Sequence, residues 1–197
     1  MDHMFSKSIA VVIAALAAVV FIGTLVHALW YAPDSEIQVP DQKQIVAATS
    51  SLPVRLQIPK LSIDADVQRV GIGKKGNMAV PTNYSDVGWY RYGTVPGQLG
   101  SAVVDGHIDN GFGLPAVFKR LTEINVGDDI YVVAEDGSRL HFKVTDKQIY
   151  PYANAPLDYI FNRSDKARLN LITCEGTWLK SEKMYDKRLV IFSELVS

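Results

Sequence analysis

The chain has 197 residues and nearly balanced charge, with 20 basic and 21 acidic residues and a formal net charge of -1. This balance gives no electrostatic reason to expect a nucleic-acid partner. Hydrophobic residues make up 48% of the chain, which favours a folded core over wholesale disorder. The length suits one domain of ordinary size plus an appendage.

The N-terminal part of the chain has the pattern of a membrane anchor. A short segment, residues 1–8, precedes an apolar run over residues 9–30. A helix over that run would be about 33 Å long, close to the roughly 30 Å of a bilayer's hydrocarbon core. Trp30 and Tyr31 stand at its far end, where aromatic rings favour the membrane interface. We predict a single transmembrane helix with the N-terminus in the cytoplasm. A buried core helix is the alternative, but no amphipathic stripe is visible.

A polar linker and one folded domain are predicted after this helix. Residues 31–51 are mostly polar and include Pro33 and Pro40. Fully extended, residues 33–51 of this stretch reach on the order of 65 Å, which would hold a domain off the bilayer while keeping it tethered. From residue 52 to residue 197 the sequence consists of short apolar runs separated by turn signals. We therefore predict one domain over residues 52–197.

Most of this domain has the pattern of short β-strands. Alternating apolar residues and flanking glycines or prolines predict strands at residues 52–58, 63–70, 78–80, 87–92, 101–105, 130–134, 140–144, 168–173 and 188–195. Asp136-Gly137, between two of them, is a preferred hairpin dipeptide. Two short helices are predicted, over Leu114–Leu121 and Ala155–Phe161. Many short strands with few helices predict an all-β-dominated domain, either a closed barrel or a sandwich.

Cys174 is the single cysteine of the chain, so neither an intramolecular disulfide nor a multi-cysteine metal site is possible. A buried structural thiol is the ordinary interpretation of a lone cysteine. Cys174, however, follows a predicted strand and precedes Gly176, which places its thiol at a strand end. A nucleophilic thiol must be partly ionised, which a nearby histidine or arginine favours.

Two other residues are candidates for chemistry with such a thiol. His107 stands where a strand ends and a glycine-rich loop begins, whereas His141 lies inside an alternating strand and has no predicted chemical role. A histidine can protonate a leaving amine. Arg188 begins the last strand, and its planar set of donors can bind a carbonyl or an oxyanion. The alternative for Arg188 is a solvated strand residue or an ion-pair partner.

The spaced motifs resemble those of the sortase family over nearly all of residues 52–197. The residues that carry this resemblance are Gly88-Trp89-Tyr90, Pro96-Gly97, Gly100, Gly106-His107-Ile108-Asp109, Phe118, Leu121, Val126-Gly127-Asp128, Ile172-Thr173-Cys174 and Arg188-Leu189-Val190. The order of the histidine, cysteine and arginine along the chain fits the family, as does an N-terminal anchor. Asn170-Leu171 departs from the Thr-Leu pair of the most familiar housekeeping form. The compact domain and the run from Thr173 to Gly176 look closest to the class F group.

The resemblance implies a closed eight-stranded β-barrel with a few short helices and a cysteine transpeptidase activity. Cys174 would be the nucleophile, His107 the general acid and base, and Arg188 the group that binds substrate and oxyanion. Thr173 would line the same pocket. The substrate would be a surface protein with a C-terminal Leu-Pro-x-Thr-Gly-like sorting signal, and the acceptor an amine on a cell-wall precursor or a pilin lysine. The resemblance implies neither a cofactor nor a metal.

Other functions compete with this interpretation. L,D-transpeptidases also place a histidine before the cysteine, but they expect a Ser-x-Gly-Cys type of sequence with an arginine close after it, which this chain lacks. Papain-like proteases place the cysteine first. A membrane-tethered β-module that binds a partner without chemistry is the non-enzymatic alternative, and it gains if His107, Cys174 and Arg188 do not share a pocket.

Overall fold

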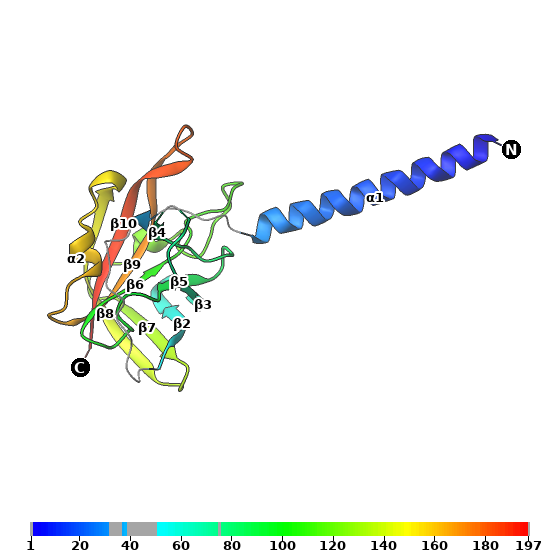
Figure 1. Cartoon of the computed structure of the whole chain (residues 1–197). Coiled ribbons are helices and arrows are strands. Elements are labelled where there is room, and N and C mark those ends of the chain that lie inside the picture. The colour runs from blue at the N-terminus through cyan, green and yellow to red at the C-terminus, as the bar shows by residue number, and fades with distance from the viewer. Residues whose placement is uncertain (1, 32–36, 39–50, 75, 197) are drawn as a thin grey trace.

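The computed structural model describes residues 2–31, 37–38, 51–74 and 76–196 of the chain. Its N-terminal helix, α1 (Asp2–Trp30), leads to a barrel-shaped domain (Figure 1). The predicted linker over residues 31–51 lies almost entirely outside the described residues. Two of its residues form strand β1 (Ile37–Gln38). The domain boundaries proposed from the sequence remain predictions.

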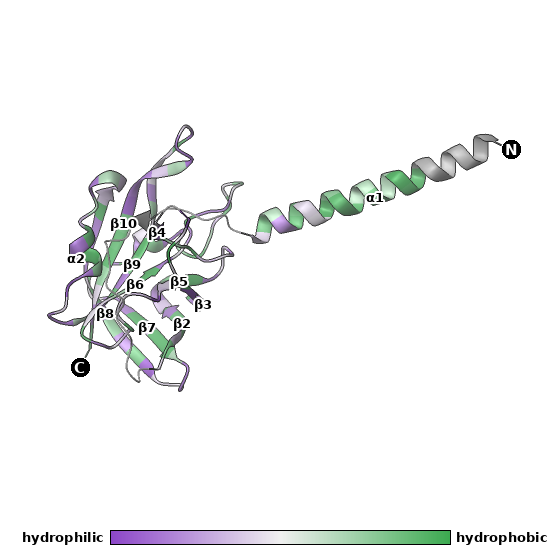
Figure 2. Ribbon diagram, viewed as in Figure 1, coloured by the Kyte–Doolittle hydropathy of each residue, from purple (hydrophilic) through white to green (hydrophobic). Residues whose placement is uncertain are grey.

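Helix α1 is long and apolar enough from Val11 to Trp30 to cross a membrane. Figure 2 shows the apolar residues of this segment on a helix that stands apart from the domain. From Val11 to Trp30 every side chain is exposed except that of Leu29, which is half-buried. A helix that is hydrophobic all round and covered by no protein is suited to a lipid environment, so α1 is a candidate membrane anchor.

The domain is a closed barrel of eight strands in the order β10-β8-β7-β2-β3-β5-β6-β9. The strands are β2 (Pro53–Ile58), β3 (Ile63–Val70), β5 (Val87–Tyr90), β6 (Gly100–Asp105), β7 (Asp129–Ala134), β8 (Arg139–Pro151), β9 (Ala167–Leu179) and β10 (Met184–Leu195). Most neighbours are antiparallel, but β3 pairs with β5, and β6 with β9, in parallel. The predicted barrel is confirmed, and closure decides between the barrel and the sandwich that the strand pattern left open.

Several short elements surround the barrel. Strand β4 (Asn77–Met78) pairs with β1 and lies outside the barrel, as does the predicted strand at residues 78–80. Three 3-10 helices are formed by Pro59–Leu61, Leu121–Glu123 and Tyr152–Asn154, and helix α2 spans Leu157–Phe161. Helix α2 confirms most of the helix predicted over residues 155–161.

The helix predicted over Leu114–Leu121 is wrong. The backbone there is committed to other partners, because the Ala116 amide donates to the Ile108 carbonyl at 3.1 Å and the Phe118 amide donates to the His107 carbonyl at 2.9 Å. Pro115 also forms a β-bridge with Asp109. These contacts fold the segment back onto the end of β6, and tertiary pairing overrides the local helix signal.

The barrel has two cores, one on each face of its central strands. Leu169 and Leu171 of β9 belong to the cluster inside the barrel, whereas Ile172 packs outside it with residues of helix α2. The Asn170 side chain also faces that outer layer and donates to the Ile160 carbonyl of α2 at 2.6 Å. Because residues 168–173 of β9 are buried, this part of the strand is a rigid support for Cys174, which follows it.

Candidate active site

Cys174 and Arg188 are cross-strand neighbours. Arg188 of β10 is the direct partner of Cys174 of β9 in the antiparallel ladder. Side chains of directly opposed residues lie on the same face of a sheet, with Cβ atoms about 5 Å apart. The predicted nucleophile and the predicted oxyanion group are therefore brought together by strand register alone.

His107 follows the strand on the other side of β9. Strand β6 runs parallel to β9 with Asp105 opposite Ile172. The Gly106 amide donates to the Ile172 carbonyl at 3.2 Å. His107 follows two residues after the end of β6, and continuing the β6–β9 register predicts that it lies level with Cys174. The alternation of side chains along β9 and β10 places Cys174 and Arg188 on the outer face of the sheet, the face that contains Ile172 and Val190. That His107 joins them there remains a prediction.

Thr173 links β9 to the segment that carries His107. Its side chain is 1% exposed, and its hydroxyl donates to the Gly106 carbonyl at 2.8 Å. This bond ties β9 to the residue before His107. A Cβ atom on Gly106 would lie 2.5 Å from the Phe118 ring, so that backbone position requires glycine. The geometry supports a positioning contact, and a substrate contact for Thr173 remains a prediction.

The contacts of His107 determine which ring nitrogen carries its proton. Its Nε2 lies 3.0 Å from the carbonyl oxygen of Pro81, and a carbonyl can only accept a hydrogen bond. Nε2 is therefore the protonated nitrogen of the neutral ring, and Nδ1 keeps the lone pair that can exchange a proton. Burial lowers the pKa of His107, while Pro81 and the Asp109 carboxylate act to raise it. The Tyr84 ring packs against the imidazole with centroids 5.2 Å apart.

The thiol of Cys174 is partly exposed. Burial raises its pKa, the positive charge of Arg188 acts to lower it, and the carboxylates of Asp105 and Asp109 act to raise it. The resting site therefore pairs a neutral thiol with a neutral imidazole. Chemistry at such a pair begins with proton transfer from sulfur to a base during attack.

Arg188 is held in place by its own strand and by an aromatic ring. Its Nη1 donates to the carbonyls of Tyr185 at 2.9 Å and Lys187 at 2.8 Å, and its Cζ lies 4.6 Å from the centre of the Tyr152 ring. The residue is 3% exposed. A fixed guanidinium beside a thiol is the kind of preorganised cation that stabilises a developing oxyanion.

A family model described as the Sortase domain matches residues 56–196, which is most of the chain. The chain belongs to the sortase family. It is therefore a cysteine transpeptidase, and sortases are cell-surface enzymes, which fits the candidate anchor in α1. A search of the curated proteins found no match to the chain.

Solved sortase structures share the fold of this sortase. A lid mutant of sortase A from Corynebacterium diphtheriae matches with a TM-score of 0.57 and 19% identity, covering 76% of this chain and 73% of that chain. Sortase C-1 from Actinomyces oris matches with a TM-score of 0.55 and 21% identity, covering 74% and 75%. A sortase D5 transpeptidase from Clostridium perfringens matches with a TM-score of 0.53 and 14% identity, covering 75% and 80%.

Sequence reasoning missed three residues that the structure brings to this site. Asp105 is 2% exposed at the end of β6, and Asp109 and Tyr185 are joined by a hydrogen bond across the site. Asp109 ends the quoted motif around His107 and Asp105 stands just before that motif, but the pattern gave neither a role. Nothing in the sequence singled out Tyr185. His141, by contrast, contacts Asp129 at 2.8 Å and stacks on Tyr131, in strands outside this site.

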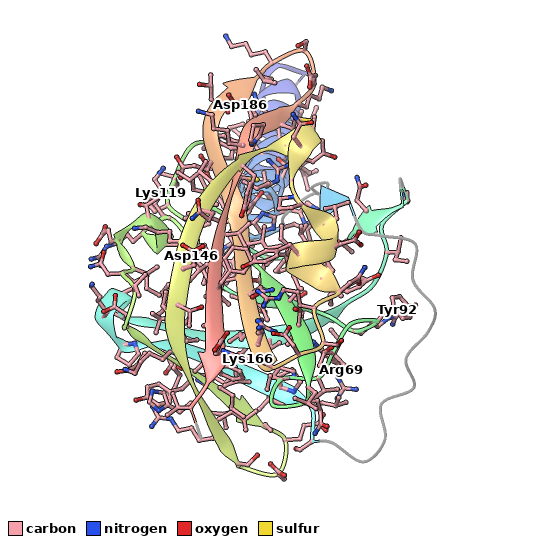
Figure 3. The ribbon with its side chains drawn as sticks, turned by 90° about the vertical axis from the view of Figure 1, so that its left-hand side faces the viewer. Arg69, Tyr92, Lys119, Asp146, Lys166 and Asp186 are labelled. Carbon is pink, nitrogen blue, oxygen red and sulfur yellow. The ribbon has the colours of Figure 1, made fainter. Side chains whose placement is uncertain are left out.

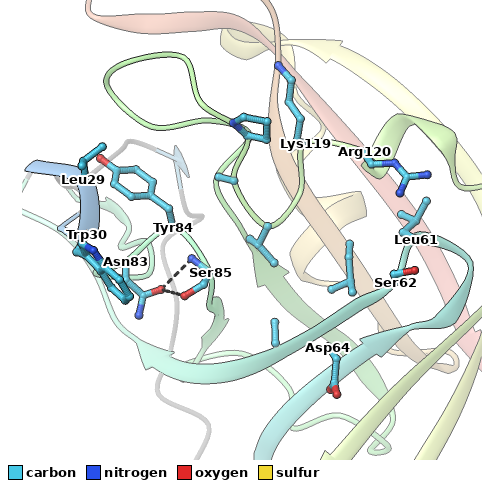
Figure 4. A pocket seen from close by; sticks show the side chains of 15 residues that line it. Leu29, Trp30, Leu61, Ser62, Asp64, Asn83, Tyr84, Ser85, Lys119 and Arg120 are labelled. Atoms are coloured by element: carbon cyan, nitrogen blue, oxygen red, sulfur yellow. Dashed lines mark hydrogen bonds between the residues drawn. The ribbon is translucent and has the colours of Figure 1, made fainter. Parts of the chain in front are cut away.

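A cleft beside α1 is a separate feature of this sortase. This cleft, of about 560 Å³, lies between the end of α1 and the barrel, and Figure 4 shows Trp30, Tyr84, Lys119 and Arg120 on its wall. None of His107, Cys174 and Arg188 lines it. The cleft adjoins the site through Tyr84, whose ring packs on His107 and whose hydroxyl donates to the Tyr31 carbonyl at 3.3 Å.

Proposed function

We propose that this sortase cleaves a Leu-Pro-x-Thr-Gly-like sorting signal and transfers the new acyl end to an amine. The observation that supports the proposal is the placement of Cys174 directly opposite Arg188 on β9 and β10. His107 follows β6, the parallel neighbour of β9, two residues after that strand ends. Together these residues are the set of groups that an acyl transfer through sulfur requires: a nucleophile, a proton carrier and an oxyanion-binding cation.

The first half of the reaction forms a thioester. Nδ1 of His107 takes the Cys174 proton as the sulfur attacks the threonine carbonyl. Arg188 balances the charge that develops on the carbonyl oxygen. The imidazolium then gives its proton to the departing glycine nitrogen, so that the carbon–nitrogen bond breaks and the acyl group remains on sulfur.

The second half transfers the acyl group. An amine attacks the thioester carbonyl, and His107 receives the amine's proton. The carbon–sulfur bond breaks, an amide forms, and the proton returns to Cys174. A cell-wall precursor or a pilin lysine supplies such an amine, and water gives slow hydrolysis. The proposed partners are surface proteins with a C-terminal sorting signal, and a class F-like subtype is part of this proposal.

The proposed topology places the N-terminus in the cytoplasm and the barrel outside the cell. Helix α1 can cross the bilayer, and the substrates proposed here are surface proteins. Within this proposal the polar segment after Trp30 leaves the barrel tethered near the membrane, where a surface protein would present its signal.

The test is mass spectrometry on the full chain in detergent, incubated with a Leu-Pro-x-Thr-Gly peptide and a small primary amine. We expect an acyl adduct on Cys174 and a product in which the amine is joined through the threonine. Cys174→Ala is the control that should give neither. If neither species forms with wild-type protein whose thiol reacts with an alkylating agent, this signal is excluded. A peptide library then separates another signal from a module that binds without chemistry.

A further inference from the structure

Tyr185 contacts three groups around the candidate active site. Its hydroxyl donates a hydrogen bond to Oδ2 of Asp109, and its carbonyl accepts one from Nη1 of Arg188 at 2.9 Å. Its ring packs edge-on against Trp178, with centroids 5.3 Å apart. One residue of β10 is therefore joined both to the arginine of the site and to the loop that carries the histidine.

Asp109 is the other end of this connection, two residues after His107. Its segment has little freedom, because Asp109 bridges to Pro115 and the Phe118 amide donates to the His107 carbonyl at 2.9 Å. A force on the Asp109 side chain is transmitted to His107 through only two intervening peptide units. The hydrogen bond to Tyr185 therefore bears on the position of the imidazole.

The hydrogen bond between Tyr185 and Asp109 joins segments of two strands that are not neighbours in the barrel. Strands β6 and β10 are not neighbours in the barrel, because β9 lies between them. Asp109 follows β6 and Tyr185 lies on β10. The hydrogen bond between them therefore crosses β9, the strand that carries Cys174. Strands β9 and β10 extend beyond the rest of the barrel as a projecting hairpin, on which Figure 3 marks Asp186. A hairpin of this kind needs a side contact to stay fixed relative to a neighbouring loop.

We propose that Asp109 and Tyr185 are a positioning pair that holds His107 in register with Cys174 and Arg188. The inference rests on the proposed function, because it assigns the pair a role in that acyl transfer. Neither residue touches the reacting atoms; both act by fixing the residues that do. Burial and the hydrogen bond to Asp109 raise the pKa of Tyr185, so its hydroxyl stays protonated and keeps donating.

The pair also places a negative charge at the site. The charged groups that act on the Cys174 thiol are Arg188 on β10, which lowers its pKa, and Asp105 at the end of β6 together with Asp109, which raise it. Asp109 raises the pKa of His107 as well. If Tyr185 releases the Asp109 carboxylate toward solvent, where water screens it, both pKa values fall.

The test compares Tyr185→Phe, Asp109→Asn and their double variant with wild type in the full chain. Tyr131→Phe is the matched control, because Tyr131 lies on β7, which borders none of β6, β9 and β10. We expect Tyr185→Phe to lower kcat roughly tenfold with KM within about twofold, since a charge-assisted hydrogen bond is lost. Asp109→Asn keeps an acceptor for the hydroxyl, so its kcat should fall less.

A second measurement is the pH midpoint for alkylation of Cys174 by iodoacetamide, which needs no peptide. We expect Tyr185→Phe and Asp109→Asn to lower that midpoint and Tyr131→Phe to leave it unchanged. The double variant should shift it no further than Asp109→Asn alone, because both changes act through one contact. A residue that merely supports the fold would not move this midpoint.

The proposal is overturned if Tyr185→Phe matches Tyr131→Phe in kcat and in alkylation midpoint, or if the effects of the two single variants multiply in the double variant. Failure of the proposed function gives a different pattern. Wild-type protein would then form no acyl product, while the alkylation midpoints would still report whether Tyr185 fixes Asp109 beside Cys174.

Discussion

Arg188 lies directly opposite Cys174 across the β9–β10 ladder, with its guanidinium bound to two carbonyls of its own strand. The arginine offers the site both a positive charge and a fixed set of donors, and these two contributions can be separated. Charge alone acts on the thiol before the reaction, whereas donor geometry matters when the carbonyl oxygen becomes an oxyanion.

Arg188→Lys keeps the charge and loses the planar fork. We expect its turnover to fall by about 10²-fold or more, the usual effect of removing an oxyanion donor. Its alkylation midpoint at Cys174 should stay near the wild-type value. Arg188→Gln removes the charge, so the midpoint should rise as well. Wild-type turnover in Arg188→Lys would show that Arg188 serves the fold and not the reaction; circular dichroism checks that each variant is folded.

The pH dependence of transfer follows from the opposite pKa shifts of the two reacting groups. One proton must be shared between His107 and Cys174, so activity is lost when both are protonated and when both are deprotonated. The pKa of His107 is lowered from 6.5, and that of Cys174 is raised from 9.0. The profile of kcat/KM should therefore be a broad plateau whose acid limb lies below 6.5 and whose alkaline limb lies above 9.0.

The measurement is kcat/KM for a fluorogenic sorting peptide across that pH range, with Cys174 alkylation followed in parallel. The alkaline limb and the alkylation midpoint should coincide, because both report the same thiol. A narrow profile centred near pH 7, with thiol ionisation well below 9.0, would mean that the site stores a thiolate instead of a neutral pair.

Strand pattern predicted an all-β-dominated domain, because alternating residues such as Leu169 and Leu171 carry a clear period of two, and the resemblance to sortases implied the closed barrel. The same pattern could not reveal partners that are distant in sequence. The segment over residues 114–121 has a local helix signal, yet its amides pair with the backbone around His107. Tyr185 is one of nine tyrosines in the chain and is distinguished only by its hydrogen bond to Asp109, a residue distant in sequence.

Asp105 makes the stability of the domain depend on pH. Its carboxyl group is 2% exposed, and its Oδ1 has no hydrogen-bond partner among the described residues. Burial raises the pKa of Asp105 well above the ordinary value of 3.8. The folded state then binds this proton more tightly than the unfolded state does, so stability is full below 3.8 and falls as pH rises toward the folded pKa.

Asp105→Asn should therefore raise the Tm at pH 8 and have little effect near pH 4. Asp165→Asn is a control of opposite sign, because Arg168 and Arg163 lower the pKa of Asp165 and that stabilisation is lost as pH falls. Its Tm should drop at pH 8. The measurement is the Tm of each variant and of wild type at pH 4 and pH 8. An equal change in Tm of Asp105→Asn at the two pH values would show that Asp105 is not a buried acid.

The single cysteine allows a direct test of membrane topology. Cys174 is the only thiol of the chain and is partly exposed, so a thiol reagent reports the location of the barrel without engineering. In intact cells that express the full chain, a membrane-impermeant maleimide should label Cys174 as completely as a permeant one. Cys174→Ala gives the background. Labelling by the permeant reagent alone would place the barrel on the cytoplasmic side, and the proposed surface substrates would then be out of its reach.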